Sequence, residues 1–208
     1  GGLGIGSGVN GTAGSAYGSG LFLQGNGSVT FNPGAGQTQT VSDVIADQPG
    51  SGGSGGNAGS GALSKSGAGT LVLGGTNTYT GGTNVTGGTV SISADANLGT
   101  GGTVALGDGT TLAFTAGGTY SHAITVAGDP AFDVGTGLTV TQSGAIADGA
   151  MPGVVEKTGA GTLVLNAANS YSGGTTIAAG TLEAGNDSAL GTGAVDLTVS
   201  GTVLAAAI

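Results

Sequence analysis

Two stretches of this sequence decide its fold: GAGTLVLGGTNTYTGGTNVTGGTV at residues 67–90 and GAGTLVLNAANSYSGGTTIAAGTL at residues 159–182. They lie within two larger blocks, residues 63–101 and 155–193, which align without gaps at an offset of 92 and are identical at 20 of 39 positions. Tandem self-similarity of this kind is the sequence signature of a repeat architecture.

A second pair of blocks, residues 31–47 and 132–148, is identical at 9 of 17 positions at an offset of 101. The two offsets differ by nine, which locates nine surplus residues between Asp47 and Leu63 in the first module. The surplus lies in the Gly/Ser tract at residues 48–62. We expect a surface loop there, because lengthening a flexible loop changes stability little.

Inside the modules the apolar residues alternate with a period of two, separated by glycine-rich turns. The alternating segments are Leu71/Leu73, Val90/Ile92, Val104/Leu106, Leu112/Phe114, Ile124/Val126, Leu138/Val140, Leu163/Leu165 and Val195/Leu197/Val199. This pattern predicts short β-strands with one buried face. Because a sandwich needs no sequence repeat, the repetition favours a solenoid, in which each winding covers its neighbour.

The strand-opening Gly-Thr pairs recur at the same spacing in each module, from Gly69 to Gly88 and from Gly161 to Gly180. We therefore predict an all-β solenoid of roughly ten coils, each with three short strands. The predicted parts are a Gly-rich lead-in with the first coils at residues 1–30, module 1 at 31–131 with the loop at 48–62, and module 2 at 132–208.

Composition excludes several other classes of protein. Glycine supplies 50 of 208 residues, which disfavours long helices, while a hydrophobic content of 38% disfavours a disordered chain. The formal net charge is -9, with two Lys or Arg residues in all, so nucleic acid is not an expected partner. There is no cysteine, and no apolar stretch is long enough for a membrane helix, so no direct membrane insertion is expected. We interpret the sequence as an excised piece of a longer protein.

Residues 67–90 and 159–182 resemble the passenger-associated transport repeat (PATR) of type V autotransporters. The second copy departs from the first where Gly74-Gly75-Thr76 becomes Asn166-Ala167-Ala168. The resemblance implies a right-handed parallel β-helix passenger, attached at the bacterial cell surface by a C-terminal β-barrel translocator that lies outside this sequence. It also implies an adhesin-like virulence role, with a host or bacterial surface glycan or protein as ligand.

From this resemblance we expect a structural stalk whose repeats assist secretion and folding, without enzymatic activity. The alternatives are a glycan-active enzyme of the polysaccharide lyase or hydrolase kind on the same fold, and a self-assembling surface filament. We assign no catalytic, cofactor-binding or metal-binding residue, and we expect no cofactor. The motif GSGVNG at residues 6–11 matches a dinucleotide fingerprint only by chance in so glycine-rich a chain, and residues 50–61 lack the aspartates of a calcium repeat.

The remaining reactive residue types each receive a structural interpretation. The closest acidic pairs, Asp43/Asp47 and Asp129/Asp133, are expected to be solvated turn carboxylates.

Lys65 and Lys157 are repeat equivalents, expected to pair with Glu156 or to cap an outer face. The single histidine, His122, is expected to share a face with Ile124 and Val126 as a shielded or rim residue, with no partner for a catalytic triad.

The tyrosines that recur at positions 79 and 171 are expected to lie over the coil edge. The alternative for Tyr79 and Tyr171 is an outward-facing platform for glycan stacking.

Overall fold

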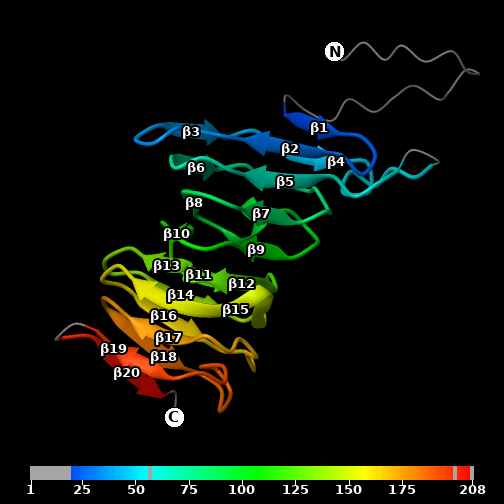
Figure 1. Cartoon of the computed structure of the whole chain (residues 1–208). Helices are drawn as coiled ribbons and strands as arrows, with labels where there is room; N and C mark the ends of the chain where they lie inside the picture. Colours follow the sequence, from blue (N-terminus) through cyan, green and yellow to red (C-terminus); the bar gives the residue numbers. More distant parts are fainter. Residues whose placement is uncertain (1–19, 56–57, 199–200, 207–208) are drawn as a thin grey trace, which may run out of the picture.

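The computed structural model describes residues 20–55, 58–198 and 201–206, and it shows a parallel β-solenoid (Figure 1). Each strand pairing within those ranges is parallel and joins one winding to the next. The same ranges contain no α-helix and one 3-10 helix, η1 (Asp95–Leu98). The predicted all-β solenoid is confirmed, and its right hand stays a prediction.

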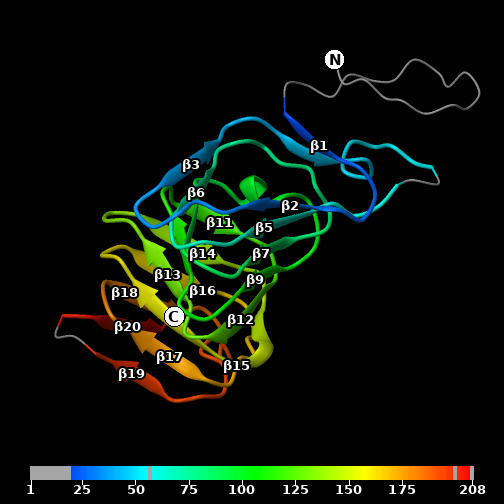
Figure 2. The same cartoon turned by 45° about the horizontal axis from the view of Figure 1, so that its top comes forward.

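The strands stack in three columns, which we call faces 1, 2 and 3. Face 1 contains β2 (Ser28–Phe31), β5 (Ala62–Lys65), β7 (Thr83–Val85), β9 (Val104–Leu106), β12 (Ile124–Gly128) and the first part of β15 (Ile146–Thr158). Figure 2 shows these strands following one another down one side of the molecule.

Face 2 begins with β3 at the same end of the stack and continues through the second part of β15. Its strands are β3 (Thr38–Val41), β6 (Thr70–Leu73), β8 (Thr89–Ile92), β10 (Thr111–Phe114), β13 (Ala131–Val134), β15, β17 (Gly174–Ile177) and β19 (Val195–Leu197). The long β15 thus runs from one face into the next.

Face 3 has strands at both ends and irregular segments between them. Its strands are β1 (Leu21–Leu23), β4 (Ile45–Asp47), β11 (Gly118–Tyr120), β14 (Thr139–Gln142), β16 (Thr162–Leu165), β18 (Thr181–Ala184) and β20 (Val203–Ala206). The segments around Thr78 and Thr100 fill the gap, since Thr78 N–H donates to Ile45 O and Thr100 N–H donates to Tyr79 O.

Face 2 shows eight layers of strands in the described part of the chain, so the prediction of ten coils is wrong. The spacing expected from the Gly-Thr pairs does occur, between the partners Leu71 and Val90. Other windings are longer, such as the one that leads from Phe132 to its partner Lys157. The predicted number also assumed one coil length for the whole chain, including residues 1–19, which lie outside the described part.

A continuous apolar column fills the space between the three faces. Its fully buried members include Leu63, Leu71, Val85, Val140 and Leu163. In the last winding, by contrast, Val195 and Leu197 are exposed, although their alternation predicted a buried face. Val199, the third residue of that predicted strand, lies outside the described residues.

The sequence repeat advances by four windings plus one face. Four steps down face 1 join Leu63 to Thr83, Val104, Ile124 and Ile146. The repeat equivalent of Leu63 is Val155, which lies beyond Ile146 in the part of β15 that belongs to face 2. Equivalent residues of the two modules therefore lie on neighbouring faces.

Candidate functional site: contacts between windings and the His122 groove

Both lysines are fully buried and bind backbone carbonyls of two successive windings. Lys65 Nζ donates to Ser66 O, Gly67 O and Gly87 O, each at 2.8 Å. Lys157 repeats the arrangement in module 2, and its Nζ donates to carbonyls of Thr158 (2.6 Å), Gly159 (2.8 Å) and Ala179 (3.2 Å). Each ammonium group uses its three protons to hold consecutive turns together.

Burial disfavours the charged form of both lysines. It lowers the pKa of Lys65 and lowers the pKa of Lys157 to about 8, against the weaker opposing effect of the Asp133 charge. The predictions of a partner in Glu156 or of an outer-face position are wrong, because both side chains point into the turns that follow their strands. The alternation contained a signal for this, since Lys65 and Lys157 are each two residues after a buried apolar residue, Leu63 and Val155, and therefore lie on the same inward face.

The recurring tyrosines are buried as well. Tyr79 and Tyr171 have no exposed surface, and their hydroxyl groups share hydrogen bonds with Thr83 Oγ1 (2.5 Å) and Thr175 Oγ1 (2.7 Å). Burial raises the pKa of each tyrosine to about 12, although the threonine bonds oppose the shift. An outward platform for glycan stacking is therefore wrong.

Two repeat-equivalent glycines make room for the tyrosine rings. A Cβ atom at Gly99 would lie 2.9 Å from the Tyr79 ring, and a Cβ at Gly191 would lie 2.9 Å from the Tyr171 ring. Both glycines also have positive φ, 88° and 66°. The same Cβ atoms would lie still closer to the backbone carbonyl oxygens of Tyr79 (2.5 Å) and Tyr171 (2.4 Å), so the carbonyl and the ring of each tyrosine together require the glycine.

Asp47 closes the corner from which the Gly/Ser tract leaves the stack. Asp47 is fully buried, and its carboxylate accepts hydrogen bonds from Gly50 N, Gly61 N, Thr80 N and the Thr80 hydroxyl at 2.7–2.9 Å. Burial alone would raise the pKa of Asp47, but these hydrogen bonds outweigh it and hold the pKa below its ordinary value. The prediction of a solvated turn carboxylate is therefore wrong for Asp47.

The equivalent Asp148 repeats this contact, which we call the aspartate clamp: an aspartate that accepts both the N–H and the hydroxyl of a Ser or Thr in the next winding. Its partners are Ser172 N, the Ser172 hydroxyl and Gly153 N. These bonds, with the Ser172 hydroxyl first, lower the pKa of Asp148. The surplus residues of module 1 are inserted between Asp47 and Gly61, so the clamp holds both ends of the Gly/Ser tract, which extends to the side of the stack in Figure 1.

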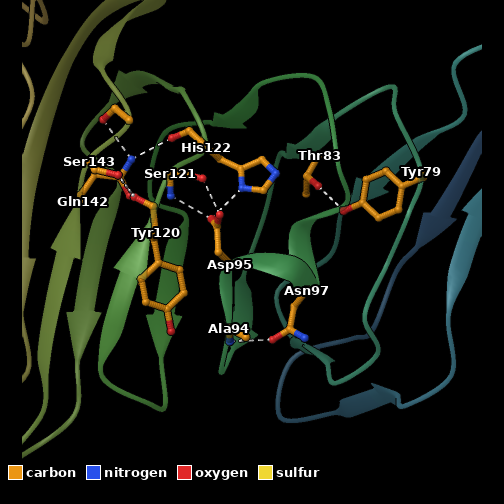
Figure 3. A network of polar contacts seen from close by, with 11 residues as sticks. Tyr79, Thr83, Ala94, Asp95, Asn97, Tyr120, Ser121, His122, Gln142 and Ser143 are labelled. Atoms are coloured by element: carbon orange, nitrogen blue, oxygen red, sulfur yellow. Dashed lines mark hydrogen bonds and ion pairs between the residues drawn. The ribbon is translucent and has the colours of Figure 1, made fainter. Parts of the chain in front are cut away.

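A third clamp includes the histidine (Figure 3). Asp95 accepts hydrogen bonds from Ser121 N (2.9 Å), the Ser121 hydroxyl (2.5 Å) and His122 Nδ1 (2.7 Å). Burial opposes ionisation of Asp95, but the bonds from Ser121 and His122 prevail and lower its pKa. His122 occupies the place that a glycine N–H takes in the other two clamps.

His122 therefore has a partner that the sequence pattern did not reveal, because Asp95 lies 27 residues earlier in the preceding winding. Its ring is partly shielded, as predicted, with 12% of the side chain exposed. Ser121 binds the same carboxylate and not the far ring nitrogen, so the three residues do not form a nucleophilic triad.

An open groove of about 560 Å³ adjoins the third clamp. It is lined by Asp95, Ala96, Gly99, Thr100, Gly101, Gly102, Ser121, His122 and Ala123. The groove combines a titratable pair, Asp95 and His122, with a concave surface, and it is the candidate binding site.

The other predicted acidic pairs do not converge on a reactive centre. Asp129 is exposed and accepts a bond from Gly109 N at 3.3 Å, and Asp133 accepts one from the Thr158 hydroxyl at 3.2 Å. Asp43 is also exposed. The dinucleotide-like motif at residues 6–11 lies outside the described residues.

The described ranges contain neither a candidate metal site nor a candidate membrane-spanning helix. No group of three or more His, Cys, Asp or Glu side chains there could hold a metal ion. No helix in those ranges has the length and apolar character to cross a membrane.

Comparison with known families matches residues 63–92 and 155–184 to the model of the passenger-associated transport repeat. The β-solenoid thus contains two copies of the PATR repeat, and this supports an autotransporter passenger segment. A stretch of 106 residues, 50% of the chain, is 40% identical to the adhesin BmaC autotransporter of Brucella suis biovar 1 (strain 1330). The aligned part spans 3% of that protein's length. No solved structure matches the chain significantly.

This class of protein implies where the chain resides. An autotransporter passenger is exposed at the cell surface and is held there by its outer-membrane translocator.

Proposed function

We propose that this segment is a structural stalk in a cell-surface adhesin passenger and that it carries out no catalysis. The observation that carries the proposal is the use of the repeated polar side chains. Lys65, Tyr79 and Asp47, like their module 2 equivalents, are buried or hydrogen-bonded between windings. Adhesion itself is supported by the similarity to a named adhesin, with a glycan or protein on a host or bacterial surface as its ligand.

The same contacts support a role of the repeats in secretion. Each lysine and each aspartate clamp joins two consecutive windings, so these bonds form only when the second winding has folded against the first. A chain without cysteine crosses a pore unfolded without disulfides, and winding outside the pore then opposes its return. Folding at the surface thereby supplies a driving force for export.

The alternative of a glycan-active enzyme finds no such support. Glycosidases need two carboxyl groups that face each other across the scissile bond. Asp47 is buried beneath its hydrogen-bond donors, and Asp129 and Asp133 bind turn and strand groups of neighbouring windings.

Surface display of the full-length passenger tests the proposal. We would compare the variants Lys157→Met and Gly191→Ala with Asp129→Asn, which removes an exposed carboxylate. Antibody labelling of intact cells is measured relative to total passenger in lysates. The proposal predicts reduced display for the first two variants and normal display for the third. Unchanged display with a demonstrably destabilised segment would contradict it.

A further inference from the structure

We infer that the groove beside Asp95, Ser121 and His122 binds a basic side chain, of Lys or Arg, presented by a protein partner. The inference rests on the proposed function, since it names the kind of partner that this adhesin segment would recognise.

The groove has the form of a binding site. Its volume of about 560 Å³ falls in the range of ~300–1,000 Å³ that small ligand sites occupy. Two successive windings build it, with η1 and the turn at residues 99–102 on one side and residues 121–123 on the other. Glycine and alanine line most of the wall, which leaves room for a long side chain.

The polar groups of the groove have their donors already in use. His122 Nδ1 lies 2.7 Å from the Asp95 carboxylate, which can only accept, so Nδ1 carries a proton. In the neutral imidazole the other nitrogen, Nε2, is then an acceptor, and Figure 3 shows it pointing away from Asp95. The hydroxyl groups of Ser121 and Thr100 donate to Asp95 and to Thr78 O.

The free hydrogen-bonding capacity of these side chains therefore consists of lone pairs beside a carboxylate. Lys and Arg side chains carry donors, no acceptors and a positive charge, so they complement this arrangement. Nε2 is also accessible, because no buried side-chain nitrogen or oxygen in the described part of the chain lacks a partner and no hydrogen bond to Nε2 is formed there.

The charge of the whole chain favours the same occupant. The formal net charge is -9, there is no arginine, and the two lysines are both buried with their ammonium groups on carbonyls. No exposed Lys or Arg side chain of the described residues competes for the groove. A basic partner is attracted over a distance by this field and oriented by the groove.

A saccharide fits the groove less well. Sugar hydroxyls both donate and accept, and sugar sites commonly add an aromatic ring, whereas no aromatic side chain lines this groove except the His122 imidazole. Saccharide binding is therefore an outcome that would overturn the inference.

In the test, the 208-residue chain is titrated with a fluorescein-labelled octapeptide of alternating Gly and Arg at low salt. Fluorescence anisotropy gives the Kd, and amide NMR shifts locate the contact. Binding should shift the amides of residues 99–102 and 121–123. Asp95→Asn and Thr100→Arg should each weaken binding at least about tenfold.

Two matched controls separate the groove from net charge. Asp129→Asn changes the charge as Asp95→Asn does, and Thr136→Arg adds a cation in an exposed turn as Thr100→Arg does in the groove. Each control should change the Kd less than about twofold. If Asp95→Asn unfolds the third clamp, Thr100→Arg still tests whether the groove binds the peptide.

Three results would overturn the inference: no binding of the peptide, equal weakening by variants and controls, or groove shifts caused by methyl glucoside and not by the Arg peptide. Because display of the full-length passenger is not measured here, failure of this inference leaves the stalk proposal standing, and failure of display leaves the peptide result standing.

Discussion

The two repeat blocks, residues 63–101 and 155–193, share their buried contacts between windings but differ in how one corner is built. In the first copy Asn97, at the end of η1, accepts bonds from Ser93 N and Ala94 N and donates to Gly75 O. In the second copy the equivalent residue is Ala189, which is buried in an ordinary turn. The lysine, tyrosine and aspartate contacts are nevertheless present in both copies.

The difference separates two kinds of polar residue. Asn77 and Asn169 occur in both copies and accept the N–H groups of Ile45 and Ile146, which belong to the preceding winding. Asn97 instead satisfies groups mostly within its own corner. The contacts between windings are thus the shared feature of the repeat, and the local corner varies.

The largest effect should come from removing a buried lysine. Lys65→Met leaves three turn carbonyls without their donor and should lower the free energy of unfolding by about 4 kcal/mol. Lys157→Met should have a smaller effect, because one of its three bonds is longer, 3.2 Å against 2.8 Å. Urea unfolding of the purified chain measures both. Losses below about 1 kcal/mol in both variants would contradict the structural role of the lysines.

Gly99→Ala and Gly191→Ala should each lower the free energy of unfolding by about 3 kcal/mol, because the new Cβ meets the backbone carbonyl oxygen and the ring of the tyrosine and also has an unfavourable φ. Gly109→Ala is the matched control, since Gly109 has φ 63° and open space around it. It should lose only about 1 kcal/mol for the backbone conformation. Equal losses at all three sites in thermal unfolding would refute the close contact with the tyrosines.

Asn97→Ala gives the first block the residue that the second block has at the equivalent position, Ala189. Four hydrogen bonds are lost, and the expected destabilisation is about 2 kcal/mol. Asn186→Ala, at an exposed turn position of the second block, removes a single exposed bond from Ser188 N (2.9 Å) and should change stability by about 0.5 kcal/mol. Hydrogen exchange of the Ser93 and Ala94 amides should accelerate in the first variant only. Unchanged exchange would show that Asn97 is dispensable.

The tyrosines predict a pH dependence. The pKa of Tyr79 and of Tyr171 is raised to about 12, so the folded chain holds these protons more tightly than the unfolded chain does. Their contribution to stability is complete below pH 10.0 and is lost as pH rises toward 12. Absorbance at the tyrosinate band should show two residues that ionise only near pH 12, and Tyr79→Phe should remove one of them. Ionisation of all tyrosines near pH 10.0 would contradict their burial.

The smallest effect should come from shortening the Gly/Ser tract. The segment between Asp47 and Gly61 is nine residues longer than the equivalent segment between Asp148 and Gly153. Deleting this surplus should change the free energy of unfolding by no more than about 1 kcal/mol, because loop length enters only logarithmically. A loss above about 2 kcal/mol in urea unfolding would show that the tract packs against the stack.

The alternation at Leu71/Leu73 and Leu163/Leu165 indicates which segments are strands and which of their faces is buried. The sequence therefore predicts the solenoid and its three strands per coil. It does not contain the partners of side chains in neighbouring windings. Residue type alone therefore predicts a surface position for Lys65 and Asp47, because it does not show the Gly87 carbonyl that accepts from Lys65 or the Thr80 N–H that donates to Asp47. The His122–Asp95 pair was missed for the same reason.

The most direct test of the account is disulfide mapping of the winding itself. The chain has no cysteine, so pairs can be introduced singly. Thr111 and Ala131 are partners on adjacent windings, whereas Thr70 and Thr162 are repeat equivalents on faces 2 and 3. Parallel strand partners approach the ~4.4–6.8 Å between Cα atoms that a disulfide requires. The double variant Thr111→Cys/Ala131→Cys should cross-link on mild oxidation, and Thr70→Cys/Thr162→Cys should stay reduced. The reverse result would contradict a parallel stack in which the repeat advances by four windings and one face.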